Sequence, residues 1–166
     1  MILGFALAIA AGAATADQEH LVKAAFIANF IKFIEWPDLG RDNVKFVVGI
    51  YGADDFDTAI DQALAGKSVS GHPIVIQQIH SESEMKACRL VVCNTESAER
   101  IAKLTKACAS GTVLVGEGED FAKDGGDIGL VVVASRVRFD INLDTARKAG
   151  VTISSKLLSL ARTVYK

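Results

Sequence analysis

The sequence predicts a single three-layer α/β domain, in which a mixed sheet of about six strands carries helices on both faces. Short apolar runs rich in β-branched residues alternate along the chain with segments of helical periodicity, a pattern typical of sheets built from strand–helix units. The 166 residues match the length of one domain. No linker rich in proline or glycine divides the chain, and no internal repeat is present.

The first sixteen residues differ from the rest because none of them is charged and nearly all are apolar or small. This stretch is too short for a membrane-spanning helix, which needs about 20 apolar residues. Ala14-Thr15-Ala16, followed by Asp17, matches the small-x-small pattern of a cleaved secretory signal. We therefore expect residues 1–16 to be a signal peptide and 17–166 to be an exported domain. A buried N-terminal helix or a membrane anchor is the alternative.

The first mature segment, from Gln18 to Trp36, is predicted to form a helix. It contains no glycine or proline, and Pro37 ends it because a residue before proline disfavours the α conformation. Lys23 and Lys32 lie on opposite sides of this helix at about 100° per residue. The helix thus has no single polar face. Either it is largely buried, with its lysine side chains reaching solvent, or one apolar side contacts a partner.

Three large aromatic residues of this helix, Phe30, Phe33 and Trp36, are the candidate partner-binding residues. Aromatic side chains of this kind are favoured as anchors in protein–protein interfaces. The alternative is that all three belong to the hydrophobic core.

The following segments alternate between strand and helix. Val44–Tyr51 is a short β-branched run between turn-forming residues and is predicted to be a buried strand. Asp54–Leu64 begins with a capping aspartate and continues with apolar residues at helical spacing. By the same criteria, further strands are predicted at 73–79, 89–93 and 112–115, one helical turn at 82–87, and a helix at 95–109 that ends before Gly111.

In the C-terminal part, Gly125-Gly126 lets the backbone turn into a strand at 127–134. This strand is apolar on both faces, which predicts a central position in the sheet. A tight connection at 135–136 leads to a strand at 137–143, and the chain is predicted to finish with a helix at 154–165.

The strand after this tight connection has a polar face. Arg136, Arg138, Asp140 and Asn142 alternate with apolar residues, so the four polar side chains share one face of the strand. Arg136 and Arg138 on that face could bind an anionic ligand or a partner. The alternative is a solvated face at the edge of the sheet.

Three cysteines in an exported chain predict one disulfide and one free thiol. Cys88 opens a predicted strand and Cys93 ends it, so the two lie about 16 Å apart. Cys108 ends the following helix, where the chain has returned to the edge at which the strand begins. We therefore expect a Cys88–Cys108 bridge, contributing about 3 kcal/mol in the chain-entropy model, with Cys93 a buried thiol. Three reduced core cysteines are the alternative.

The composition and the remaining motifs argue against several kinds of site. Eighteen basic against twenty acidic residues leave no basic field for nucleic acid. The three histidines lack metal-ligand spacing, so no metal or cofactor is expected. Gly125-Gly126-Asp127 leads into an apolar strand and is interpreted as a turn. Because no catalytic grouping remains, the sequence indicates a binding or regulatory domain that is not an enzyme.

A series of motifs in fixed order resembles a known family. The helix ending in Phe33-Ile34-Glu35-Trp36-Pro37 matches its opening signature, Cys88-Arg89-Leu90-Val91-Val92 matches its cysteine-led strand, and Val137 to Leu143 matches a late strand. Further matches are Val47-Val48-Gly49-Ile50-Tyr51-Gly52, Gly71-His72-Pro73-Ile74, Val113-Leu114-Val115, Phe121-Ala122, Gly125-Gly126-Asp127-Ile128 and Ile153 to Ala161. Together they cover nearly all of residues 22–161. The chain resembles the YfiR-like periplasmic proteins.

This resemblance implies a periplasmic α/β protein without enzymatic activity. The better-known members repress an inner-membrane diguanylate cyclase by binding its periplasmic part, and an outer-membrane, peptidoglycan-binding lipoprotein relieves the repression by sequestering the repressor. Members tend to form homodimers and to carry disulfides. The cysteines here allow one bridge at most, which departs from a two-bridge pattern.

Two functional hypotheses follow. The first is a periplasmic regulator of cyclic-di-GMP signalling and biofilm formation that acts by protein–protein contact. The second is a small-ligand binding protein whose sheet edge holds an anion through Arg136 or Arg138.

Overall fold

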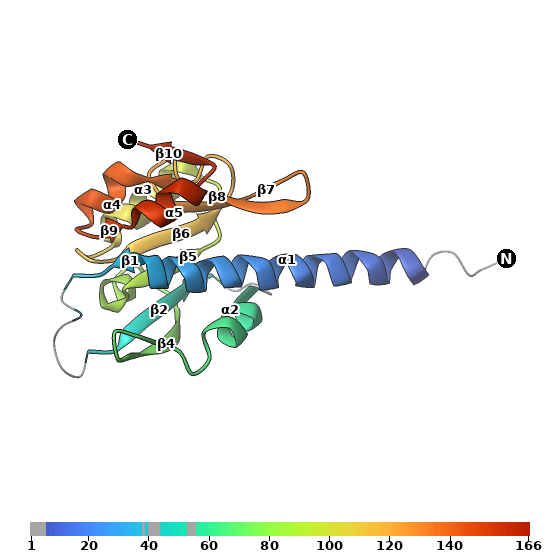
Figure 1. Ribbon diagram of the computed structural model, residues 1–166, viewed down its shortest axis with the longest axis horizontal. Helices are drawn as coiled ribbons and strands as arrows, with labels where there is room; N and C mark the ends of the chain where they lie inside the picture. Colours follow the sequence, from blue (N-terminus) through green and yellow to red (C-terminus); the bar gives the residue numbers. More distant parts are fainter. Residues whose placement is uncertain (1–5, 38, 40–43, 53–55) are drawn as a thin grey trace.

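The computed structural model describes residues 6–37, 39, 44–52 and 56–166, with side chains from residue 16 onward. It confirms the predicted three-layer α/β architecture, in which a mixed sheet is flanked by helices (Figure 1). In the described part of the chain, no helix is both long and apolar enough to cross a membrane.

In chain order, the elements are α1 (Ala6–Phe33), β1 (Ile34–Glu35), β2 (Phe46–Tyr51), α2 (Phe56–Leu64), β3 (Ser68–Val69), β4 (His72–Ile79), the 3-10 helix η1 (Glu84–Ala87), β5 (Leu90–Cys93), α3 (Ala98–Ala107), β6 (Val113–Glu117), β7 (Ile128–Val133), β8 (Arg136–Asn142), α4 (Leu143–Lys148), β9 (Thr152–Ile153), α5 (Ser155–Leu160) and β10 (Thr163–Tyr165).

The main sheet has eight strands in the order β10-β8-β7-β6-β5-β2-β4-β3, and a separate small sheet pairs β1 with β9. The five strands from β4 to β7 in this order run parallel. Strand β8 is antiparallel to β7, whereas β10 is parallel to β8. All six predicted strands are present. The additional ones, β1, β3, β9 and β10, have two or three residues each, too few for a periodic pattern to reveal them.

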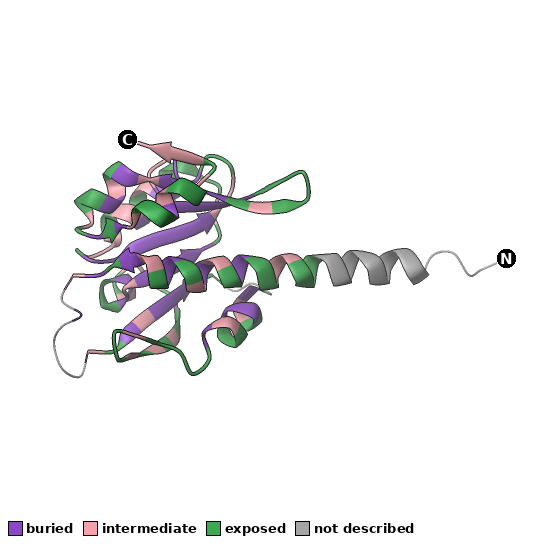
Figure 2. Ribbon diagram, viewed as in Figure 1, coloured by how far each residue is buried: buried purple, intermediate pink, exposed green. Residues whose placement is uncertain are grey.

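Apolar clusters fill both sides of the sheet. On one side, α1, α2, α4 and α5 pack against residues such as Val48, Val115 and Phe139. On the other side, α3 and η1 pack against a smaller cluster that contains Leu114 and Phe121. The buried residues concentrate on the central strands and on the sides of the helices that face them (Figure 2). Helices therefore cover both faces of the sheet.

Helix α1 ends three residues earlier than predicted, at Phe33. Pairing of Ile34 with Ile153 in the small sheet draws the chain into an extended conformation before Pro37 is reached. Trp36 then folds back on the helix: its indole Nε1 donates a hydrogen bond to the carbonyl oxygen of Ile31 at 3.0 Å. The start of α2 was predicted at Asp54, which lies outside the described residues.

The C-terminal helix predicted at 154–165 is wrong in its second half. Helix α5 ends at Leu160, and the last residues form β10 beside β8. The Arg162 backbone N–H donates to the Phe139 carbonyl oxygen at 2.8 Å. Its side chain donates from Nε to Oδ1 of Asp140 at 2.9 Å. This pair directs the chain into the sheet instead of continuing the helix.

The same contact corrects the predicted polar face of β8. Arg136 and Arg138 are exposed as expected, but Asp140 is fully buried. Strand β8 is also not an edge strand, because β10 pairs with it and places Thr163 opposite Asp140. Of the four polar residues of this face, Asp140 therefore belongs to the packed interior, and Asn142 is half-buried.

Candidate functional site

The hairpin of β7 and β8 extends beyond the neighbouring strands. Pairing between β6 and β7 ends at Leu130, whereas pairing between β7 and β8 continues to Val133 opposite Arg136. A two-residue turn at Ala134 and Ser135, both with positive φ, closes the hairpin. Its tip is exposed and projects in the direction in which α1 runs toward the N-terminus (Figures 1 and 2).

The apolar face of this hairpin is covered by α1 only in part. Period-two alternation places Leu130 and Val132 on the same face. Leu130 is buried under the helices, whereas Val132 lies one rung further out and is exposed. On α1, Val22 is likewise exposed. The hydrophobic core thus opens to solvent between the helix and the hairpin.

A groove of about 790 Å³ occupies this opening. Its apolar lining comes from Val22 and Phe26 of α1 and from Val132 and Val137 of the hairpin. At its base the Phe26 ring lies 5.4 Å from the ring of Phe139, which belongs to the core. Its polar lining consists of Gln18, Glu19, Ser135 and Arg136. Apolar walls with a polar rim are the arrangement found in protein–protein interfaces.

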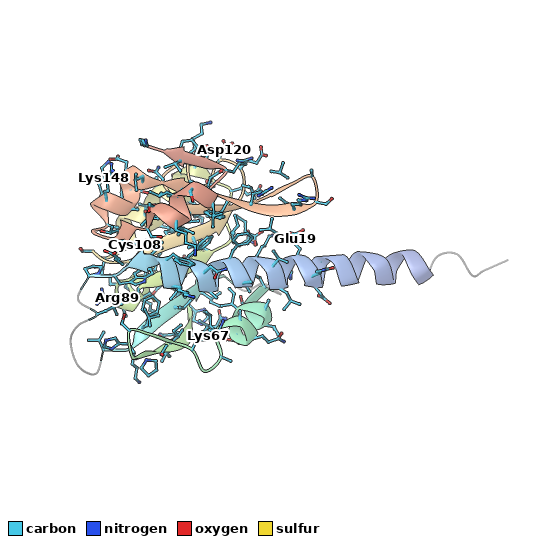
Figure 3. All side chains as sticks on the ribbon, in the orientation of Figure 1. Glu19, Lys67, Arg89, Cys108, Asp120 and Lys148 are labelled. Carbon is cyan, nitrogen blue, oxygen red and sulfur yellow. The ribbon has the colours of Figure 1, made fainter. Side chains whose placement is uncertain are left out.

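A buried ion pair holds α1 in place beside this groove. The Lys23 ammonium, almost fully buried, donates to Glu117 Oε2 at 2.5 Å and lies 2.7 Å from Glu19 Oε1. Burial alone would lower the pKa of Lys23, but hydrogen bonds to Glu117 and Glu19 more than offset it, so the pKa is raised. Glu19 lies on the side of α1 that faces the hairpin (Figure 3). The charged Lys23 therefore fixes Glu19, a residue of the groove rim, in its position.

The three aromatic residues predicted to bind a partner lie outside this groove. Phe30 is fully buried against Phe139, and Trp36 is buried with its ring edge-on to Phe46 at 4.9 Å. Phe33 is half-buried and lies under the Lys156 ammonium at 5.0 Å. Phe30 and Trp36 therefore pack as core residues in this conformation, although Trp36 keeps 8% exposure where it lines a second cavity. Phe33 has the largest accessible surface of the three.

The two arginines predicted to bind an anion are not brought together in one cavity. Both are exposed on β8, and Arg136 lines the groove whereas Arg138 does not. Arg138 pairs across the hairpin with Val131 and shares its face. The groove therefore presents a single arginine to any anionic ligand.

The residues that line the groove were missed by sequence reasoning. One signal was present: three consecutive valines, Val131 to Val133, make β7 apolar on both faces. We interpreted this pattern as a central strand, which is correct up to Leu130. Pairing with β6 ends there, so the last valines lie beyond β6 and pair only with β8.

The structure describes Cys88, Cys93 and Cys108 as free thiols, so the predicted Cys88–Cys108 bridge is not formed in it. All three belong to or pack against the smaller hydrophobic cluster. Burial raises the pKa of Cys93 and of Cys108 to about 12, which makes the reactive thiolate scarce at neutral pH. The pairing stays a prediction.

The Gly-Gly-Asp segment has a structural role. Gly125 has a φ of +112°, and a Cβ on either Gly116 or Gly126 would overlap the Phe121 ring. The buried Asp127 Oδ2 accepts a hydrogen bond from the Leu114 N–H at 2.8 Å. In the described part of the chain, no three His, Cys, Asp or Glu side chains are grouped to hold a metal. This turn therefore packs an aromatic ring and orders two strands.

Asp127 is expected to make stability depend on pH. Its burial raises the pKa to about 6, and its Oδ1 has no hydrogen-bond partner among the described atoms. Because this folded-state pKa lies above the unfolded value of about 3.9, the native state binds more protons between these pH values. The Asp127 contribution to stability is therefore present below about pH 4 and is lost as the pH rises to about 6.

Urea unfolding across this window should show that the wild type loses on the order of 2 kcal/mol more stability than Asp127→Asn does. Asp61→Asn, at an exposed position of α2, controls for the loss of one charge. Parallel pH profiles for the wild type and Asp127→Asn would contradict the assignment.

Comparisons with known proteins agree with this fold. A family model described as YfiR/HmsC-like matches residues 20–162. No curated protein matches the chain. Similar solved structures include an ABC domain from Streptococcus pneumoniae in complex with L-Trp, with a TM-score of 0.57, 14% identity, and coverage of 85% of this chain and 60% of that one.

A second similar structure is a conserved domain protein from Vibrio cholerae, with a TM-score of 0.50 and 13% identity. The match covers 74% of this chain and 55% of that one. This chain thus spans little more than half the length of either protein, and at such identities the likeness concerns the fold alone.

Proposed function

Because the chain belongs to the YfiR/HmsC-like family, we propose that it is a non-enzymatic periplasmic regulator. In this proposal, residues 1–16 are removed on export. The domain at 17–166 then binds the periplasmic part of an inner-membrane diguanylate cyclase and represses it, which lowers cyclic-di-GMP output. Release would follow when a peptidoglycan-binding lipoprotein of the outer membrane sequesters the domain.

The groove between α1 and the β7–β8 hairpin is the observation that carries this proposal. Its apolar lining continues the hydrophobic core outward, so a partner side chain inserted there would contact Phe26 and Val137 away from water. Burial of apolar surface stabilises a complex by about 25 cal/mol per Å² before the costs of association are subtracted. Glu19 and Arg136 on opposite walls supply charges of both signs, which orient the partner.

The proposal predicts that Val132→Asp weakens binding to the cyclase's periplasmic part by at least about tenfold, equivalent to about 1.4 kcal/mol. A carboxylate at this apolar wall would have to lose its water when the partner docks, and it would lie across the groove from Glu19. The effect is measured by isothermal titration calorimetry. The purified mature domain is titrated with the periplasmic part of a membrane diguanylate cyclase that a neighbouring gene encodes.

Val133→Asp is the matched control. Val133 is the next residue of β7, similarly exposed at 39% against 44% for Val132, but it lies on the opposite face of the hairpin. Equal affinities for the two variants would contradict the groove as the binding surface. If the wild type binds no cyclase but is stabilised by small anions, and Arg136→Ala abolishes that thermal shift, the anion-binding alternative is favoured instead.

A further inference from the structure

Strand β4 leaves most of one edge of the main sheet open. On its inner side, β4 pairs with β2 along Ile74 to Ile79. On its outer side, β3 pairs only with His72 and Pro73. In the described part of the chain, no strand covers the outer edge from Ile74 onward. The open edge is about 20 Å long at roughly 3.3 Å per residue.

The direction of the backbone groups along this edge follows from one hydrogen bond. The Ile74 N–H points outward, because it donates to the Lys67 carbonyl oxygen at 3.0 Å on the β3 side. Successive residues of a strand direct their N–H and C=O groups to alternate edges. Ile76 and Gln78 therefore also point their N–H and C=O groups outward, where no strand of the described chain pairs with them.

The side chains of β4 do not protect this edge. Natural edge strands avoid unwanted pairing by means of lysines, prolines, bulges or covering loops. The strand His72–Ile79 contains no Lys, Arg, Asp or Glu, and its one proline, Pro73, lies at the end already covered by β3. Ile74 and Ile76 are half-buried toward the larger core, and Val75 is exposed on the other face. Among the described residues, the outward N–H and C=O groups of Ile76 and Gln78 thus have no strand partner and can pair with an added strand.

We propose that the open edge of β4 binds an extended segment of a partner protein, which adds to the main sheet as a further strand. Such strand addition gains its affinity from backbone hydrogen bonds and its specificity from alternate side chains. The uncharged edge fits a segment with β-branched residues facing Ile74 and Ile76. This surface is separate from the groove of α1 and the hairpin, and the inference stands independently of the cyclase.

A second cavity favours an acidic residue at one end of the added segment. A space of about 910 Å³ begins at Ile74 and extends between α1 and the turn before β3, with Lys32, Lys67 and Glu35 among its lining residues. Lys67 lies on the turn that leads into β3 (Figure 3). A segment antiparallel to β4 would direct its C-terminal end here. Two lysines against one glutamate favour an acidic residue at that end.

The test uses a fluorescein-labelled peptide of alternating threonine and valine that ends in glutamate, added to the mature domain. Fluorescence anisotropy should show binding tighter than about 1 mM. Amide hydrogen exchange resolved by NMR should show that the peptide slows exchange at Ile76 and Gln78 selectively. The amides of Val75 and Gln77 point toward β2 and should be slow with or without peptide.

Ile76→Pro removes an outward N–H without removing a bond to β2, a placement that edge strands tolerate. It should weaken peptide binding at least tenfold, whereas Val132→Asp in the hairpin groove should leave it unchanged. Exchange on the wild type keeps the test valid if Ile76→Pro does not fold. Absence of binding, or binding without slowed exchange at Ile76 and Gln78, would overturn the proposal. A wild-type dimer in sedimentation that Ile76→Pro abolishes would also overturn it, because the occupant would then be a second copy.

Discussion

Phe30→Ala is expected to lower the free energy of unfolding by about 3–5 kcal/mol, the range for removing a fully buried phenylalanine. The Phe30 side chain has no solvent exposure, and its ring meets Phe139 edge-on with centroids 5.0 Å apart. The substitution leaves a cavity between α1 and β8 that the surrounding sheet cannot close, because helices are fixed on both of its faces. Urea unfolding followed by circular dichroism measures the loss.

Phe33→Ala is the matched control on the same helix. Phe33 is half-buried at the last residue of α1, so its loss should cost clearly less than that of Phe30. The pair also separates two roles for Phe30. A Phe30→Ala variant that keeps wild-type stability but loses partner binding would contradict the core assignment and restore Phe30 as an interface anchor.

Arg162→Met is expected to destabilise the fold by about 3–5 kcal/mol, because it leaves a buried carboxylate without its cation. The Arg162 guanidinium donates to both oxygens of Asp140, from Nε at 2.9 Å and from Nη2 at 2.5 Å. The Asp140 side chain is 1% exposed, against 31% for Arg162. The loss of stability therefore comes from leaving the Asp140 carboxylate buried and unpaired. The variant should also release β10 from β8.

A double variant distinguishes this ion pair from simple packing. Asp140→Leu combined with Arg162→Met replaces both charges by apolar groups and should recover much of the stability lost in Arg162→Met. Lys148→Met removes one member of an exposed ion pair, Lys148–Asp144, and should change stability by less than about 1 kcal/mol. If Arg162→Met costs no more than Lys148→Met, the buried pair does not hold the C-terminal strand.

Local patterns in the sequence were sufficient for most elements. The run from Gln18 without glycine or proline predicted a helix, and β-branched runs predicted all six of the longer strands. The motifs from Val22 to Ala161 predicted the family, which the YfiR/HmsC-like match confirms. These predictions succeed because helical and strand periodicities, and the glycines and prolines that end them, act within a few residues.

Three features are determined by the tertiary structure alone. Val22 and Val132 become walls of one groove although 110 positions separate them. Asp140 is buried because it pairs with Arg162. In the described part of the chain, β4 has an open edge because only the two-residue strand β3 lies outside it. Periodicity assigns a side chain to a face of its own element, but the order of strands in the sheet determines which other element meets that face. Phe30 and Trp36, which we predicted as interface anchors, therefore lie in the hydrophobic core. The exposed apolar surface lies instead where β7 extends beyond the end of β6.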